Sequence, residues 1–308
     1  LGPEQEYELW GVTIGGVLFF LIGLADDLFK LSATVKLLLQ FVVAAAAWWG
    51  GGRIEFVGLP MLGLWQFPVI LSLVVTLLWL VGMANAINFM DGMDGLAAGV
   101  SGIAAVVMLV VTLLLDRPAA AMIAAALAGG SLGFLRYNFN PAQIFMGDGG
   151  AYFLGFTLAG IGVIGVAKVA ATLAVILPFC ILAVPILDMS TVILERLSLG
   201  QSPFQPDKRH LHHRLLKAGL SQRLSVMFIY ALTLWVGSLA LVLAGLPSGG
   251  TYLLGATLIL AVIGFGARRH RPPVPENPEG EGRQDSSIPP QAEETTLSTP
   301  TPQHTDPH

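Results

Sequence analysis

Charged residues are scarce in this sequence. Asp, Glu, Lys and Arg together make up 12% of its 308 residues, whereas 54% are hydrophobic, and the mean hydropathy is +0.72. Soluble domains usually carry about twice that share of charge, so the composition indicates a polytopic membrane protein. The net charge of −4 does not by itself decide for or against nucleic acid. Most acids lie in motifs or near the chain ends, and we expect no nucleic-acid partner.

Cysteine is nearly absent, and no secretion signal begins the chain. The one cysteine, Cys180, lies within an apolar run, which excludes a disulfide framework and a thiolate metal site and indicates helix packing. Residues 1–9 are polar and acidic and lack the positive region and the cleavage site of a signal peptide. We expect residues 1–9 to be an extracytoplasmic stub of a chain that begins within a longer protein.

Long apolar runs dominate the rest of the sequence. Most of nine such segments approach the roughly 20 residues that a helix needs to cross about 30 Å of hydrocarbon. Backbone polar groups find no water in a bilayer, so helices are the expected spanning form. The sequence thus predicts an all-α transmembrane bundle over residues 10–267. The segments are 10–25, 33–49, 68–86, 97–115, 119–136, 151–167, 170–195, 224–245 and 250–267.

Basic residues predict the orientation of these segments. If the nine alternate, one side receives the C-terminal tail and four joints, numbered first to fourth, at 26–32, 87–96, 137–150 and 196–223. That side, with the adjoining helix ends, carries 13 of the 16 Lys and Arg residues, and the other carries Arg53, Arg117 and Lys168. Such an excess is typical of the cytoplasmic side.

The tail has a different composition. Residues 272–308 hold nine of the 19 prolines, with Glu, Ser, Thr and Gln and almost no apolar residues. Such a segment buries too little apolar surface to fold. We expect residues 268–308 to form a disordered cytoplasmic extension.

The first joint contains the adjacent carboxylates Asp26 and Asp27, followed by Lys36 at the start of the next span. Adjacent carboxylates repel, so one of them needs a proton, a lysine or a divalent metal. One Asp would suit a base toward a phosphate or hydroxyl, and Lys36 a point charge for a phosphate. A solvated helix end is the plain alternative.

The second joint lies in a stretch that reads Asn85-Ala-Ile-Asn88-Phe-Met-Asp91-Gly-Met-Asp94-Gly. Uncompensated carboxylates at membrane depth cost several kcal/mol and indicate a functional site, although an ordinary Asp-Gly turn between helices is the alternative. Asp91 and Asp94 are three residues apart and would share a face in a helix. Carboxylate and Asn oxygens are the ligands that Mg²⁺ prefers.

The third joint ends in Phe145-Met-Gly147-Asp148-Gly-Gly150. Its glycines let the backbone approach a ligand, and the helix expected to begin near 151 would present free N–H groups to an anion. Asp148 at that place would repel a phosphate unless a metal lay between them. Asp148 is therefore the first candidate metal ligand, and a helix cap is the alternative.

The fourth joint is strongly basic and contains Arg209-His210-Leu-His212-His213-Arg214. Such a segment suits the phosphates of a nucleotide or lipid. Zinc is the rival ligand because two of the histidines could share a helical face, but no fourth soft ligand is evident and the cations oppose it. Asp188, inside an apolar run, stands apart. The sequence leaves open whether it pairs with a neighbouring helix or with this joint.

The joints gather acids, amides, a lysine and a basic segment at one membrane face. Metal-dependent phosphoryl transfer needs this combination. A membrane prenyltransferase also uses Mg²⁺ and a diphosphate, but it would release pyrophosphate and leave the basic segment unexplained. A transporter with an acid-lined path is the non-enzymatic alternative. Transport sites favour ionisable groups near the bilayer midplane, whereas these acids cluster at one face.

The four joints, in this order, resemble the polyprenyl-phosphate N-acetylhexosamine-1-phosphate transferase family over about residues 10–267. The His-Leu-His-His-Arg-Leu form is more similar to the branch that transfers N-acetylglucosamine-1-phosphate for teichoic acid, O-antigen or related glycans than to the muramoyl-pentapeptide branch. The matching pieces are Asp26-Asp27 with Lys36 and Gln40, Asn85 to Leu96, Asn140-Pro-Ala with Phe-Met-Gly-Asp148, and Asp207 to Leu215.

The resemblance implies a reaction. N-acetylhexosamine-1-phosphate would pass from a UDP-sugar to undecaprenyl phosphate with release of UMP. The cofactor would be Mg²⁺, with Mn²⁺ as the alternative, and the active site would face the cytoplasm from the plasma (inner) membrane. Membrane lipid and a second copy of the chain are further candidate partners.

The resemblance also implies roles by motif position. Asp26 would be the base on the lipid phosphate or a group that positions it, with Asp27 and Lys36 beside the diphosphate. Asp148 and Asn88 would hold Mg²⁺, and Asp94 and Phe145 would face the uracil. The remaining candidates are Asp91, Asp94 and His210 for catalysis, and Asn85, Arg209, His210, His212, His213 and Arg214 for substrate binding.

Two features depart from the family pattern. The family normally has two further helices before residue 10, which implies that this chain is N-terminally truncated. It often has Ser or Thr shortly after the Asp of the Gly-Asp motif, where this chain has Gly150-Ala151. One hydroxyl contact is therefore expected to be missing.

Overall fold

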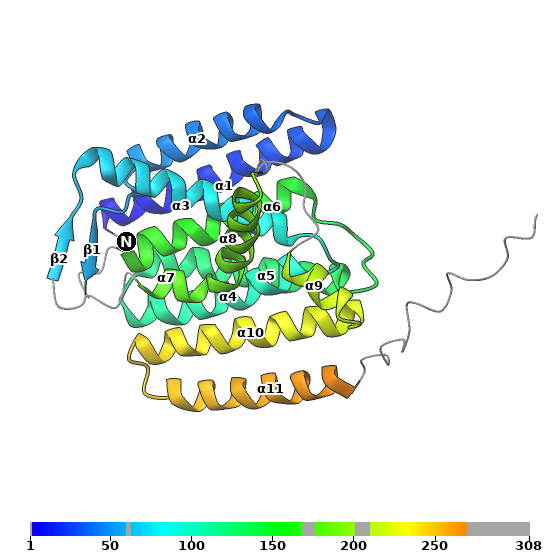
Figure 1. The fold of residues 1–308 in the computed structure, drawn as a ribbon. Coiled ribbons are helices and arrows are strands. Elements are labelled where there is room, and N and C mark those ends of the chain that lie inside the picture. Colours follow the sequence, from blue (N-terminus) through cyan, green and yellow to red (C-terminus); the bar gives the residue numbers. More distant parts are fainter. Residues whose placement is uncertain (1, 60–62, 168–175, 201–209, 270–308) are drawn as a thin grey trace, which may run out of the picture. The chain divides into compact units, whose positions relative to one another are not determined.

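A computed structural model describes residues 2–59, 63–167, 176–200 and 210–269. These residues form helices and one antiparallel hairpin of β1 (Phe56–Leu59) and β2 (Gly63–Gln66), as Figure 1 shows. The prediction of a helical membrane bundle is confirmed. The helices are α1 (Pro3–Phe29), α2 (Ala33–Trp49), α3 (Val69–Met90), α4 (Leu96–Leu114), α5 (Pro118–Asn138), α6 (Gly147–Ile161), α7 (Ile176–Ile181), α8 (Ala183–Ser198), α9 (Leu211–Lys217), α10 (Gln222–Leu243) and α11 (Gly249–Arg269).

Among the residues that the structure describes, seven helices are long and apolar enough to cross a membrane, and α2 is a shorter apolar helix of 17 residues. The chain is therefore a multi-pass membrane protein. The first helix begins at Pro3, seven residues before the predicted start at residue 10, so most of the predicted polar stub is helical. Proline suits the first turn because its missing N–H would have no partner there. The predicted tail lies outside the described residues from residue 270 onward.

The predicted span over 170–195 is not one continuous helix. Its described part forms α7 and α8, which are separated at Leu182. Pro185 has no N–H to bond the backbone one turn before it, and its ring crowds that turn, so a helix cannot run through unbroken. Figure 1 shows α8 lying across the direction of α4 and α10. The break turns the C-terminal half of this segment, α8, across the other helices.

The second joint is a turn rather than a helix. The helix α3 ends at Met90 and α4 begins at Leu96, so the expectation that Asp91 and Asp94 share a helical face is wrong. Gly95 has a φ of 77°, a backbone conformation that glycine adopts without steric cost. Tyr230 of α10 donates a hydrogen bond to the carbonyl of Gly95, which holds the turn against α10.

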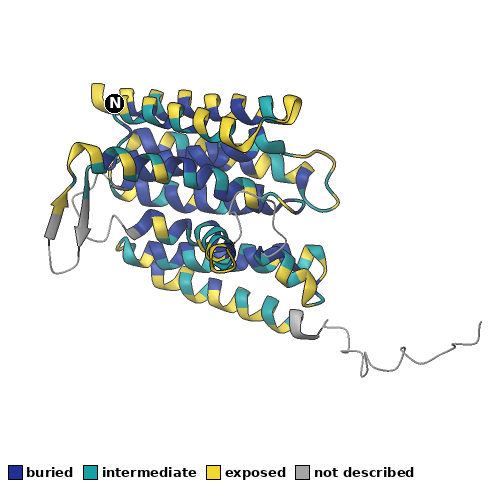
Figure 2. Ribbon diagram, turned by 45° about the horizontal axis from the view of Figure 1, so that its top comes forward, coloured by how far each residue is buried: buried dark blue, intermediate teal, exposed yellow. Residues whose placement is uncertain are grey.

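Helix α6 lies in the centre of the bundle. It packs against α1 and α3 and is buried along most of its length, whereas the outward faces of α1, α2 and α11 are exposed (Figure 2). Small residues permit the close approach of α1. A Cβ on Gly23 would lie 2.4 Å from the backbone nitrogen of Gly149. The contact brings the C-terminal part of α1 directly onto the start of α6.

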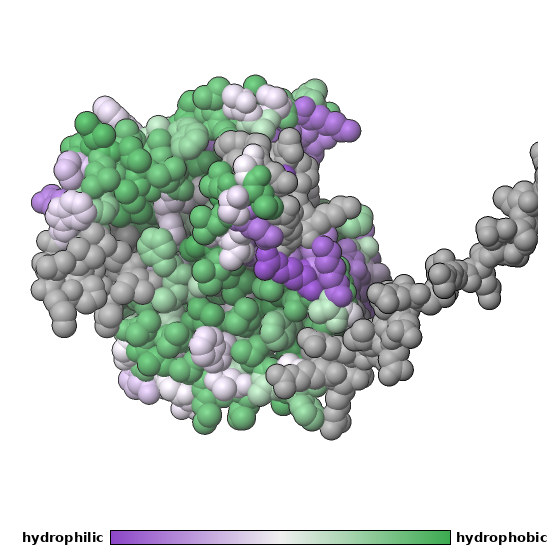
Figure 3. Space-filling view, in the orientation of Figure 1, coloured by the Kyte–Doolittle hydropathy of each residue, from purple (hydrophilic) through white to green (hydrophobic). Residues whose placement is uncertain are grey.

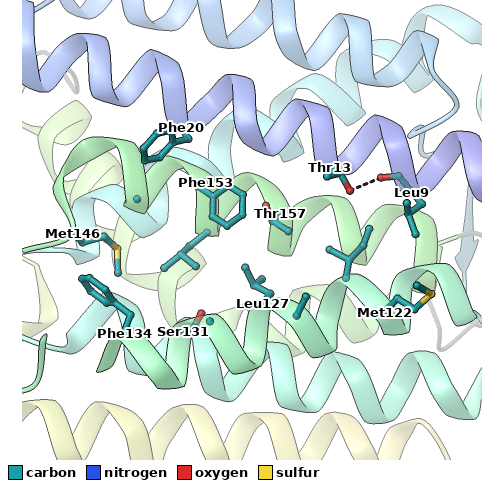
Figure 4. A pocket seen from close by; sticks show the side chains of 15 residues that line it. Leu9, Thr13, Phe20, Met122, Leu127, Ser131, Phe134, Met146, Phe153 and Thr157 are labelled. Carbon is teal, nitrogen blue, oxygen red and sulfur yellow. Dashed lines mark hydrogen bonds between the residues drawn. The ribbon is translucent and has the colours of Figure 1, made fainter. Parts of the chain in front are cut away.

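An apolar cavity of about 620 Å³ lies between α1, α5 and α6 (Figure 4). Phe20, Leu127 and Phe153 are among the side chains that line it, and Met146 and Gly150 line the part nearest Asp148. Its walls offer hydroxyl groups from Thr13, Ser131 and Thr157 but no charged side chain. The cavity therefore supplies no charged ligand for a metal or a phosphate, and the charged side chains lie beside it.

Candidate active site

Hydrophilic side chains gather where the helices meet at one end. In Figure 3 they appear at the joint between α1 and α2 and over α8 and α9, while most of the described surface in this view is hydrophobic. Apolar side chains on the helices can face lipid, whereas charged side chains there would be energetically costly. Charged residues are therefore expected in the loops. The four polar joints lie at this end, and the contacts below show how closely they meet.

Lys36 connects two carboxylates from different helices. Its Nζ lies 2.7 Å from Oδ2 of Asp26 on α1 and 3.7 Å from Oδ2 of Asp148 on α6. The side chains of Asp26 and Lys36 are 12% and 23% exposed, so this ion pair is shielded from most of the solvent. Lys36 thus supplies the cation that adjacent carboxylates require. Ser32 caps the helix that carries Lys36 by accepting a hydrogen bond from the N–H of Val35.

Asp27 binds the start of α6. Its Oδ1 accepts from the N–H of Asp148 at 3.2 Å and its Oδ2 from the N–H of Gly149 at 3.4 Å. The sequence predicted that these helix N–H groups would be presented to a bound anion, but the anion that they bind in the structure is the Asp27 carboxylate. Gly147 permits this contact, since its φ is 66° and a Cβ there would lie 2.6 Å from Asp27 Oδ2.

Asp148 faces α3 and α2 rather than its own helix. Its Oδ1 accepts from Nδ2 of Asn88 at 2.9 Å, and its Oδ2 faces Lys36. The alternative that Asp148 caps α6 is wrong, because Met146 is at the N-cap position and the first N–H groups of the helix are bound by Asp27. Asp148 and Asn88, the two predicted metal ligands, therefore lie side by side at the end of α3.

Asp91 adds a further negative charge close by. Burial, together with the negative charges of Asp148, Asp27 and Asp94, raises the pKa of Asp91 to about 7. Asp26, Asp27, Asp91 and Asp148 are called the carboxylate cluster below. Within the described part of the chain, Lys36 is the cation that pairs with carboxylates of this cluster. The remaining negative charge favours binding of another cation.

Magnesium fits this donor set. Among the residues that the structure describes, no group of three His, Cys, Asp or Glu side chains is gathered around one point as a complete metal cage. Mg²⁺ needs no such cage, because it is usually bound by one or two carboxylates together with substrate phosphates. Asp148 and the amide oxygen of Asn88 are the oxygens that would hold it. The excess negative charge of the carboxylate cluster supports this assignment.

Asp94 joins the second joint to the third. Its Oδ2 accepts from Nδ2 of Asn140 at 2.9 Å and from the N–H of Ala142 at 3.1 Å. Arg223, at the start of α10, donates through Nε to the carbonyl of Asn140 at 3.1 Å. Three joints are thereby connected around Asn140. Phe145 on the third joint is 79% exposed, so its ring is open to a ligand.

Asn85 lies one turn before Asn88 on α3. Its Nδ2 donates to Oε1 of Gln40 at 2.7 Å and to the carbonyl of Val81 at 2.8 Å. Gln40 is fully buried on α2, one turn after Lys36. Both N–H groups of the Asn85 amide are therefore used within the helix bundle, beneath the carboxylate cluster.

The structure describes the fourth joint at residues 196–200 and again from His210 onward. The ring of His210 lies 5.9 Å from that of Phe89, the residue after Asn88. Its Nδ1 lies 3.0 Å from Oδ2 of Asp188 on α8. Asp188 thus pairs with the basic joint, one of the two alternatives that the sequence left open. The sequence feature that drew attention to Asp188 was its position inside an otherwise apolar run.

His212 and Arg214 contribute differently from what the sequence predicted. His212 is 2% exposed, its two ring nitrogens have no hydrogen-bond partner, and burial lowers its pKa to about 4. It is therefore neutral at pH 7 and adds no positive charge to this joint. Arg214 pairs with Glu195 at 2.8 Å. His213 lies beside His212, with 4.2 Å between the ring centroids, and Arg209 lies outside the described residues.

The sequence is similar to proteins named as transferases. A family model described as "Glycosyl transferase family 4" matches residues 9–166, which include the first three joints. A "Probable undecaprenyl-phosphate N-acetylglucosaminyl 1-phosphate transferase" of Bacillus subtilis is 37% identical over 235 residues, or 74% of this chain and 64% of the relative. A "Decaprenyl-phosphate N-acetylglucosaminephosphotransferase" of Mycolicibacterium smegmatis is 35% identical over 277 residues, or 82% and 68%.

The name of a third relative states a different transferred group. The "Phospho-N-acetylmuramoyl-pentapeptide-transferase" of Symbiobacterium thermophilum is 37% identical over 217 residues, or 64% of this chain and 62% of the relative. The chain spans about two thirds of the length of the curated relatives it matches.

Proposed function

Because the chain belongs to glycosyl transferase family 4, we propose that it transfers N-acetylglucosamine-1-phosphate from UDP-N-acetylglucosamine to undecaprenyl phosphate. The sugar and the lipid acceptor are chosen from the name of the Bacillus subtilis relative. The observation that carries the proposal is the meeting of Asp27, Asn88 and Asp148, which come from three helices. Their arrangement beside Lys36 suits a bound diphosphate and a divalent cation.

The proposed reaction exchanges one phosphoanhydride bond for another. An oxygen of the lipid phosphate attacks the phosphorus that bears the sugar, and a new P–O bond forms. The bond from that phosphorus to the oxygen bridging it to UMP breaks, and UMP leaves with the electron pair. Lipid-linked diphosphate sugar is the second product. Catalysis of such a transfer depends mainly on positioning and on stabilising the spread negative charge.

The residues of the chain have separate tasks in this proposal. When bound, Mg²⁺ would neutralise charge on the diphosphate oxygens. Asp148 and Asn88 hold it at the end of α3, where their side chains already touch. Lys36 provides a fixed positive charge for the phosphates. Asp26, which is paired with Lys36, is better suited to orient that lysine than to remove a proton.

Asp27 keeps α1 and α6 in register, because it binds the first N–H groups of α6. Phe145 offers an exposed ring on which the uracil would stack. The excess of basic residues on the side of the four joints supports a site that faces the cytoplasm from the plasma membrane.

The test is UMP release by the 308-residue chain, reconstituted with undecaprenyl phosphate and UDP-N-acetylglucosamine. We expect UMP and the lipid-linked sugar to appear together, and to disappear when the lipid or the divalent cation is removed. Mn²⁺ in place of Mg²⁺ tests the alternative cofactor. UDP-N-acetylmuramoyl-pentapeptide, offered in parallel, tests the donor named for the Symbiobacterium relative.

Asp148→Asn should lower turnover about 100-fold or more, as expected for a group that acts on transition-state charge. The matched control is Glu55→Gln, which alters an exposed acid paired with Arg53 in the segment joining α2 to the hairpin. Absence of UMP with every donor, from protein that unfolds cooperatively on heating, would refute the proposal. Full activity of Asp148→Asn would refute the metal assignment alone.

A further inference from the structure

Asp188 has no task in the proposed reaction, yet it is fixed at two points. It lies on α8 in an otherwise apolar stretch, and its side chain is 6% exposed. One carboxylate oxygen, Oδ2, lies 3.0 Å from Nδ1 of His210, and the other, Oδ1, accepts from the backbone N–H of Leu211 at 2.6 Å. One oxygen is thus bound to His210 and the other to Leu211, both within the fourth joint. A carboxylate in this setting would be costly without such partners.

The contact determines which nitrogen of His210 carries a proton. An ionised carboxylate can only accept hydrogen bonds, so Nδ1 of His210 must be the donor. Nε2 is then the nitrogen that remains for another partner. The His210 side chain is itself 9% exposed, and its ring lies beside Phe89, next to the metal candidate Asn88. Of the titratable groups in the described residues, His212 has its ring 5.8 Å away and nearly parallel, and His213 lies beyond it.

We infer that Asp188 is a positioning residue: it holds His210 in the Nδ1–H form and turns Nε2 toward the substrate site. The part of this inference that concerns catalysis rests on the proposed function. The tautomer of His210 can be tested without measuring turnover. The same arrangement of acid, imidazole and acceptor is used in other enzymes to fix a histidine in one tautomer. The alternative is that Asp188 only ties α8 to α9.

Asp188→Asn distinguishes these two roles. The N–H of Leu211 needs an acceptor, so the amide oxygen of the asparagine must face Leu211. The amide NH₂ group then faces Nδ1 of His210, which must give up its proton and become an acceptor. The variant keeps the size of the side chain and the hydrogen bond from the N–H of Leu211 on α9 to residue 188 on α8. It reverses the tautomer of His210.

The first experiment is the ¹⁵N spectrum of the histidine side chains in the purified wild-type chain. His210→Gln identifies the His210 signals by their loss. We expect wild-type His210 to carry its proton on Nδ1 and the Asp188→Asn variant to carry it on Nε2. An Nε2–H form in the wild-type protein would overturn the inference even if the variant failed to fold. This outcome does not depend on whether the chain releases UMP.

The second experiment measures UMP release. We expect Asp188→Asn to lower kcat about tenfold or more with little change in KM for the nucleotide sugar. In the His210→Gln background the same substitution should add little further loss, because the residues act as a unit. Glu195→Gln, the same type of change on an exposed acid of α8, is the control and should leave kcat within about twofold.

Independent, additive losses from Asp188→Asn and His210→Gln would show that Asp188 does not act through His210. An unchanged kcat in Asp188→Asn with a reversed tautomer would show that the tautomer does not matter to the reaction. Either result would overturn the inference. Failure of the wild-type chain to turn over would instead count against the proposed function.

Discussion

At the scale of single residues, the site combines acids that repel one another with one lysine. The carboxylate cluster brings four Asp side chains from α1, α6 and the turn after α3 to one end of the bundle. Lys36 neutralises part of that charge. Carboxylates that are held close together to bind a cation repel one another when the cation is absent. This repulsion lowers the stability of the cation-free protein. The pH dependence of stability should therefore reveal them.

Asp91 should weaken the metal-free protein at alkaline pH. Its pKa is about 7 in the folded chain and close to 4 in an unfolded one, so the folded state binds the extra proton between these values. Stability contributed by this proton is present at acidic pH and is lost as the pH rises toward and beyond 7. Asp91→Asn should raise the unfolding temperature at pH 8 in the presence of a chelator, by an amount equivalent to about 1–2 kcal/mol.

The control for Asp91 is Asp116→Asn. Asp116 lies in the turn between α4 and α5, and its φ of 53° is one that asparagine tolerates. We expect this variant to melt like the wild type at both pH 5 and pH 8. Equal melting of Asp91→Asn and wild type at pH 8 would show that Asp91 is not destabilised by its neighbours.

His212 should have the opposite effect at acidic pH. Its pKa is about 4 in the folded chain and about 6.5 when unfolded, so below pH 6.5 the unfolded state binds the extra proton. Stability should fall as the pH decreases from 6.5 toward 4, by at most about 1.4 kcal/mol per pH unit. His212→Leu should make this slope shallower in thermal unfolding between pH 4 and pH 7.5.

His213→Leu serves as the control, because His212 remains in place. Burial of His212 is kept and only the charge of His213, which also lowers the pKa of His212, is removed. The slope of His213→Leu should therefore stay closer to that of the wild type than the slope of His212→Leu. If His212→Leu leaves the slope unchanged while His213→Leu reduces it, the burial of His212 is not the cause of the acid sensitivity.

At the scale of helices, the contact between α1 and α6 aligns the site. Gly23 and Gly149 let the two helices approach closely, and Asp27 then reaches the first N–H groups of α6. A Cβ on Gly23 would lie 2.5 Å from the backbone carbon of Asp148. Backbone atoms cannot move aside as a flexible side chain can, so the helices themselves would have to separate.

Gly23→Ala should therefore destabilise the protein by about 1–3 kcal/mol and lower turnover through the displaced Asp27. The matched control is Gly82→Ala on α3, where nothing lies within 4 Å of the added Cβ. That variant should be as stable as the wild type or more stable by less than about 1 kcal/mol. Thermal unfolding and UMP release measure both effects. Equal behaviour of the two variants would contradict the assigned helix contact.

The helices were the most predictable part of the structure. Apolar runs of the required length become helices because no other form satisfies the backbone within lipid. Their ends depend on local signals that compete with this pattern. The polar residues before residue 10 continue α1, Pro185 divides the segment after residue 176, and Gly95 belongs to a turn rather than a helix.

At the scale of the molecule, alternation of the spans and the distribution of Lys and Arg predicted that the four joints share one side. The contacts from Asp27 to Asp148, Asp94 to Asn140 and His210 to Phe89 place these joints together. The individual partners could not be derived in this way. Asp27 and Asp148 are 121 residues apart, and such pairs depend on how helices pack rather than on local sequence.

The central claim is that separate joints surround one divalent cation. The most direct measurement replaces Mg²⁺ by Fe²⁺, generates hydroxyl radicals with ascorbate and peroxide, and maps the backbone cuts in the reconstituted chain. We expect cuts near Asp27, Asn88 and Asp148 that are suppressed by excess Mg²⁺, lost in Asp148→Asn and retained in Glu55→Gln. Cuts confined to one joint, or cuts that persist unchanged in Asp148→Asn, would contradict a shared site.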